Sequence, residues 1–121
     1  MNKAEWDAMG PRQRDEVVAL NLMGWQRSVL QNIYAQLRPP GSDECTIDMA
    51  PHYTTDRNAC ALVLDEIEKL GDDTILRFLD VFKKWCDITQ ARGDSRQAAW
   101  FGMRAHPNLI CFCAVQAVPD E

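Results

Sequence analysis

Residues 53–71, with the sequence YTTDRNACALVLDEIEKLG, carry the clearest structural pattern in the chain. Thr54, Thr55 and Asp56 offer side-chain oxygens that can cap the free N–H groups of a first helical turn. Apolar side chains then recur at steps of three and four residues, at Cys60, Val63, Leu64, Ile67 and Leu70. Gly71 can adopt the left-handed conformation that ends a helix. The segment predicts an amphipathic helix around which the rest of the chain is organised.

The composition is that of one globular domain. The chain has 121 residues, 46% of them hydrophobic and 26% charged, and a single core typically serves roughly 100 to 200 residues. We therefore expect one domain spanning residues 1–121 rather than a disordered chain. The net charge of −5 makes nucleic acid an unfavourable partner, because the protein repels a phosphate backbone. Acidic and basic residues are interspersed along the chain, and this pattern argues against a surface that mimics DNA.

The cysteine pattern and the apolar runs indicate the cellular compartment in which the protein is expected. The chain has five cysteines, an odd number without the spacing of a disulfide framework: Cys45, Cys60, Cys86, Cys111 and Cys113. This usage predicts a reducing environment. Residues 1–9 lack an apolar signal region, and no later run approaches the roughly 18 apolar residues of a membrane span. We expect a cytoplasmic protein without membrane contact.

Two short helices are predicted before residues 53–71. Asn2 and Glu5 have capping-box spacing for a helical turn that Gly10 ends. Pro11 suits the first position of a second helix, and Gly24 closes it. Residues 28–37 show helical spacing as well, although a strand there is an open alternative, and residues 42–51 read as a loop.

Residues 71–105 support two interpretations. The apolar period favours a helix, with Ile75, Phe78, Leu79, Phe82 and Cys86 on one face. Aromatic and β-branched composition instead favours strands at residues 75–81, 85–91 and 97–104, with a turn around Gly93. We predict the strands, as a three-stranded antiparallel meander. The alternative is an all-α fold in which residues 73–92 are helical.

The last predicted element begins at Pro107 and ends before Pro119. Its residues are apolar on nearly every side, which is typical of a buried helix. The chain as a whole is therefore expected to fold as an α+β domain in the order αααβββα, with helices packed on a small antiparallel sheet.

Several of these segments together resemble the phage ABA sandwich family, also called the BC1872 family, of small phage and prophage proteins. The first is residues 6–25, which begin with Trp-Asp-Ala-Met and end with Met-Gly-Trp. The second is the cap at residues 53–56, where Thr54 stands in place of the family's Ser. The third is the closing helix at residues 107–118, preceded by Arg104, Ala105 and His106 where the family tends to place an acid and a Thr. The resemblance implies a layered α+β fold and a viral or prophage origin, so that the expected location is the cytoplasm of a host cell. It implies no activity and no catalytic residues.

No residue pattern predicts catalysis or a metal. Cys111 and Cys113 point about 200° apart around a helix, so they cannot share an ion there. His52 and His106 are the two histidines, and we interpret them as a loop residue and a helix-start residue. The chain has no Gly-rich phosphate loop, no serine nucleophile elbow and no His-Glu-x-x-His pattern. We expect neither an enzyme nor a bound cofactor.

The candidate partner-binding residues are the aromatic and imidazole side chains that sequence context leaves near charges or in a loop. They are Trp6, Trp85, Tyr53 and His52. We expect a non-enzymatic accessory protein of a phage or prophage that binds a host or phage protein, including inhibition of a host defence system such as CRISPR–Cas. One alternative is a small-molecule or nucleotide binder that uses a cleft beside residues 38–51. Another is a structural homodimer joined through an edge strand.

Overall fold

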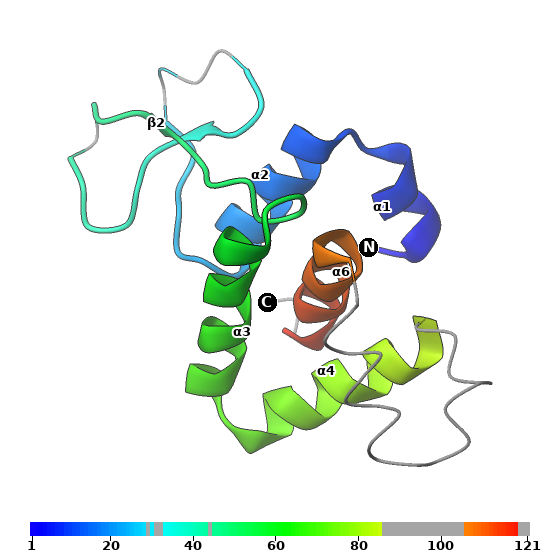
Figure 1. Ribbon diagram of the computed structural model, residues 1–121. Helices are drawn as coiled ribbons and strands as arrows, with labels where there is room; N and C mark the ends of the chain where they lie inside the picture. Colours follow the sequence, from blue (N-terminus) through cyan, green and yellow to red (C-terminus); the bar gives the residue numbers. More distant parts are fainter. Residues whose placement is uncertain (29, 31–32, 44, 86–105, 119–121) are drawn as a thin grey trace.

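A single central helix is surrounded by the other helices (Figure 1). The computed structural model describes residues 1–28, 30, 33–43, 45–85 and 106–118. In these residues the elements follow the order α1 (Lys3–Ala8), α2 (Pro11–Asn21), β1 (Gln36–Leu37), β2 (Asp48–Met49), α3 (Arg57–Leu70), α4 (Asp72–Trp85) and α6 (Pro107–Ala117). The protein is thus mixed helix and sheet, and helices dominate. No helix in the described residues is both long and apolar enough to cross a membrane.

The central helix is α6, and it is buried as its sequence predicts. Pro107 occupies its first turn, and the Nδ1 atom of His106 accepts a hydrogen bond from the backbone N–H of Asn108. The buried side chains lie on nearly every side of α6: Pro107, Ile110, Cys111, Phe112, Cys113, Ala114 and Ala117. Helices α2, α3 and α4 all contact it. The core of the protein is therefore built around α6 rather than around a sheet.

Helix α3 confirms the helix predicted within residues 53–71, but the chain is organised around α6 and not around this helix. The side chain of Asp56 accepts a hydrogen bond from the backbone N–H of Asn58, and Gly71 ends the helix with a φ of 104°. The buried face consists of Ala59, Cys60, Val63 and Ile67. Leu64 and Leu70 were expected on this face but are 40% and 50% exposed. The buried stripe is therefore narrower than the apolar spacing suggested.

Helix α4 shows that the predicted strand at residues 75–81 is wrong. Thr74, Phe78 and Phe82 recur every four residues and are buried where α4 contacts α3 and α6. Asp72 in the first turn and Lys83 in the last turn both suit the helix dipole. Helical period and end charges therefore override β-propensity. The all-α alternative for residues 73–92 agrees as far as Trp85, whereas residues 86–105, which hold the other two predicted strands, lie outside the described part.

The segment between α2 and α3 forms a two-stranded antiparallel sheet instead of the helix predicted for residues 28–37. Gln36 pairs with Met49 and Leu37 with Asp48, and an isolated bridge joins Gln26 to Arg38. The segment projects beyond α2 and α3 in Figure 1. Local apolar spacing was misleading, because hydrogen bonds from elsewhere in the chain hold this backbone.

The N-terminal helices are confirmed. The side chain of Asn2 accepts a hydrogen bond from the backbone N–H of Glu5 at the start of α1. The side chain of Arg14, on α2, donates hydrogen bonds to the carbonyl oxygens of Trp6 and Asp7, on α1. These bonds fix the short α1 against α2, so that Trp6 reaches the core.

Candidate functional site

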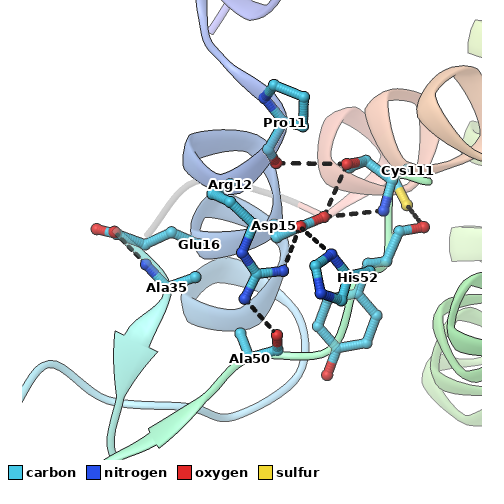
Figure 2. A network of polar contacts seen from close by, with 10 residues as sticks. Pro11, Arg12, Asp15, Glu16, Ala35, Ala50, His52 and Cys111 are labelled. Atoms are coloured by element: carbon cyan, nitrogen blue, oxygen red, sulfur yellow. Dashed lines mark hydrogen bonds and ion pairs between the residues drawn. The ribbon is translucent and has the colours of Figure 1, made fainter. Parts of the chain in front are cut away.

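Asp15, on α2, is a fully buried carboxylate at the centre of a polar network (Figure 2). One of its oxygens accepts hydrogen bonds from the backbone N–H of Thr54, at 2.9 Å, and from the Thr54 hydroxyl, at 2.7 Å. Its other oxygen accepts a hydrogen bond from Arg12, at 2.6 Å. A buried carboxylate requires such partners, because an uncompensated charge in the core is strongly unfavourable.

Arg12 extends the network to the sheet segment. Its second terminal nitrogen donates a hydrogen bond to the carbonyl oxygen of Ala50, at 2.6 Å. The Nδ1 atom of His52 lies 4.0 Å from Asp15, beyond hydrogen-bond distance, and the His52 side chain is 65% exposed. The arrangement lacks the close contact that a histidine base and its orienting carboxylate require. We interpret the network as a clamp that fixes residues 50–54 against α2.

Glu16 forms a second clamp beside the first. It is 4% exposed, and one of its oxygens accepts a hydrogen bond from the backbone N–H of Ala35, at 3.1 Å. Its other oxygen accepts a hydrogen bond from Arg27, at 2.6 Å. Two successive carboxylates of α2 therefore hold both sides of the sheet segment, Glu16 at β1 and Asp15 beyond β2.

Glu16 holds a turn in an unusual backbone conformation. The N–H of Gln36 donates a hydrogen bond to the carbonyl oxygen of Ile33, and Ala35 inside this turn has a φ of 69°. This φ falls in the left-handed region, which costs a residue other than glycine about 1 kcal/mol or more. The Ala35 side chain is nevertheless fully buried. The turn is therefore held by its surroundings and not by local preference.

Large apolar side chains are exposed on this turn and on the strand beside it. Ile33 is 57% exposed and Tyr34 56%, while Met49, opposite Gln36 in the sheet, is 44% exposed. We call Ile33, Tyr34 and Met49 the turn patch. Exposed apolar side chains on a backbone that is held by buried contacts are typical of a recognition surface.

The structure separates the four residues that the sequence suggested for partner binding. Trp6 is fully buried, and its indole N–H donates a hydrogen bond to the Asn108 side chain at 2.9 Å. Tyr53 is 2% exposed. Both are core residues in this structure and offer no surface to a partner. His52 and Trp85 are exposed, but they lie on different elements, and Trp85 packs edge-on against Phe112 of α6.

Burial perturbs the titration of groups in the core beneath the clamp. It raises the pKa of Tyr53 above its ordinary value, and a hydrogen bond with the Trp25 side chain opposes this shift. The interaction between the Cys60 and Cys111 side chains raises the pKa of Cys111 far above its usual range, as does burial, and lowers the pKa of Cys60. The Cys111 thiol donates its one hydrogen to the carbonyl oxygen of Tyr53, at 3.2 Å. These thiols are structural donors in the core.

The described residues contain a small pocket and no group of side chains that could bind a metal ion. In that part of the chain, no group of three or more histidine, cysteine or acidic side chains could hold an ion. A pocket of about 70 Å³ is lined by Met1, Asn21, Val115, Gln116 and Val118. Small-molecule sites usually measure roughly 300 to 1,000 Å³, so this pocket cannot enclose a nucleotide.

Sequence reasoning missed the clamps and the turn patch. No motif singled out Asp15 or Glu16 within the helix predicted to begin at Pro11. One signal was present, because Asp15 stands three, four and seven residues before Val18, Ala19 and Leu22, all of which are buried. A carboxylate on the apolar face of a helix indicates a buried polar network. Nothing local identified its partners, which lie up to 39 residues away.

Comparisons with family models, with curated proteins and with solved structures found no match to this chain. The likeness to the phage ABA sandwich family therefore rests on the sequence motifs alone.

Proposed function

We propose that this protein is a small accessory protein that acts by binding another protein through the turn patch of Ile33, Tyr34 and Met49. The observation that supports this proposal is the pairing of exposed apolar side chains with a backbone held in a strained conformation. Ile33 and Tyr34 directly precede Ala35, whose positive φ is maintained by the buried Glu16. Strain that persists because the surroundings enforce it is often associated with function.

Preorganisation gives the physical reason why such a patch binds well. A loop that is ordered before binding loses less conformational entropy on association, and the difference increases affinity. Tyr34 is the strongest anchor of the patch, since tyrosine combines a large apolar ring with a hydroxyl and few rotatable bonds. The partner that fits this chemistry is a protein with an apolar groove that accepts the two adjacent side chains.

We propose a phage or prophage origin and a host or phage protein as the partner because of the resemblance in the sequence motifs. Inhibition of a host defence system such as CRISPR–Cas is one form that this binding takes in our proposal. The net charge of −5 supports a protein partner over a nucleic-acid partner.

The proposal is tested by affinity capture from a bacterial lysate with three baits. They are the wild-type chain, the double variant Ile33→Ser/Tyr34→Ser, and the control Leu64→Ser, which removes an exposed leucine of α3. We expect a protein that is retained by the wild-type chain and the control and lost with the double variant. With that protein purified, the double variant should bind at least about tenfold more weakly, as expected for hot-spot residues.

One result of the same experiment would contradict the proposal. If the double variant keeps its thermal stability and retains the same proteins as the wild-type chain, the turn patch is not the binding surface.

A further inference from the structure

A second exposed surface lies on α4, and its residues are complementary to the same residues on a second copy of the chain. Its residues Asp72, Leu76, Leu79 and Lys83 are spaced by four, three and four positions, which places them on one side of the helix. All four are exposed, Leu76 at 60% and Leu79 at 43%. The opposite side of α4 holds the buried Thr74, Phe78 and Phe82. We call the four exposed residues the α4 stripe.

The α4 stripe is self-complementary in one orientation. If a second copy of α4 runs antiparallel across a two-fold axis, Leu76 lies opposite Leu79 and Asp72 opposite Lys83. Both pairs are centred on the same point of the helix, between Arg77 and Phe78. Such isologous contacts are the commonest basis of homodimers.

The charges decide between the two possible orientations. A parallel pair would set Asp72 against Asp72 and Lys83 against Lys83, and like charges in contact are unfavourable. The antiparallel pair instead joins opposite charges at both ends of the leucine contact. In the described residues, neither Asp72 nor Lys83 takes part in an ion pair within the chain.

From this complementarity we propose that the α4 stripe is a homodimer interface, with two copies of α4 packed antiparallel. Four leucine side chains form the centre of the contact, and two Asp72–Lys83 pairs border it. This interface is separate from the turn patch, so each protomer of the dimer presents its own patch and the dimer is a bivalent binder. The proposal does not depend on the function assigned to the turn patch.

Sedimentation equilibrium of the full chain tests the dimer. We expect a concentration-dependent equilibrium between monomer and dimer for the wild-type protein. The variant Leu76→Glu/Leu79→Glu should raise the dissociation constant at least about 100-fold, because it places four like charges at the contact. Leu64→Glu, an equivalent change on α3, should leave the dissociation constant unchanged. A wild-type chain that stays monomeric at all soluble concentrations, or a dimer insensitive to the Leu76→Glu/Leu79→Glu change, overturns the proposal.

A charge exchange tests the antiparallel orientation. Asp72→Lys and Lys83→Asp should each weaken the dimer about tenfold, and the double variant Asp72→Lys/Lys83→Asp should restore it. Asp73→Lys is the matched control, because it makes the same charge change in the same helical turn but off the stripe. Failure of the double variant to recover affinity, while both single variants stay folded by circular dichroism, rules out the antiparallel pairing.

Discussion

Asp15 and Thr54 lie 39 residues apart and are joined through one carboxylate oxygen, which accepts both the backbone N–H and the hydroxyl of Thr54. Thr54 stands just before α3, so this contact connects the middle of α2 to the start of the next long helix. It also closes the sheet segment between them, which carries the turn patch. Stability and presentation of the patch are therefore linked at Asp15.

Replacing Asp15 by alanine should destabilise the protein by about 3 kcal/mol. The change leaves the backbone N–H of Thr54 without its acceptor, leaves the Thr54 hydroxyl with only a long hydrogen bond to the Pro11 carbonyl oxygen, at 3.4 Å, and removes the carboxylate partner of Arg12. Unsatisfied buried donors are costly. Urea denaturation measures the loss. Asp65→Ala, at an exposed position of α3, is the control and should stay within about 0.5 kcal/mol of the wild type. Equal stabilities for the two variants would show that the clamp contributes nothing.

Replacing Ala35 by valine should destabilise the protein by about 2 kcal/mol. A β-branched side chain is poorly tolerated at a φ of 69°, and the fully buried position leaves no room for two more methyl groups. Ala61→Val makes the same change at an exposed position of α3 and should cost less than about 1 kcal/mol. Denaturation curves of the two variants give the comparison. Similar losses at both positions would contradict the strained turn.

Burial of Tyr53 should make stability fall as the pH rises above about 10, in addition to the fall that Cys111, whose pKa is also raised, produces from the ordinary cysteine value of about 8.5. The pKa of Tyr53 is raised in the folded state, so the unfolded chain loses the phenol proton first, near the ordinary tyrosine value of about 10. Unfolding then releases a proton, and alkaline pH favours the unfolded state. The stabilising contribution of Tyr53 is fully present below the pKa of this residue in the unfolded chain. It is lost as the pH rises toward the pKa of Tyr53 in the folded protein.

Two matched variants isolate this effect, because the chain has only two tyrosines. In urea denaturation at pH 8 to 11, Tyr53→Phe should flatten the decline of stability with pH. Tyr34→Phe changes an exposed phenol and should leave the decline as it is in the wild type. If both variants decline like the wild type, the burial of Tyr53 does not control alkaline stability.

Replacing Asn108 by alanine should cost about 1 to 3 kcal/mol, since it leaves the indole N–H of the fully buried Trp6 without an acceptor. The loss should appear with increased hydrogen exchange in α1, because Arg14 also donates to the Asn108 side chain and to α1 carbonyl oxygens. Asn58→Ala, at an exposed position of α3, serves as the control. Unchanged exchange in α1 would mean that Trp6 is held by packing alone.

The elements that the sequence predicts well carry their signals locally. Asp56 and Gly71 mark the ends of α3, and Pro107 marks the start of α6, within a few residues of the apolar pattern they enclose. Helix α4 was mistaken because its aromatic and β-branched residues suit a strand, while the choice is made by Phe78 and Phe82 packing against other helices. The sheet segment and the clamps depend on Glu16 and Asp15, whose partners are distant in the chain. The spacing of neighbouring residues does not reveal contacts between residues so far apart in the sequence.

The central position of α6 also constrains how the protein is made. During translation, α1, α2, α3 and α4 leave the ribosome before residues 107–117 do. Until then their apolar faces lack the helix against which they pack, and the nascent chain cannot complete its core. The native state is therefore reached only after α6 emerges from the ribosome. If the ribosome stalls earlier, the nascent chain exposes apolar helix faces that are prone to aggregation.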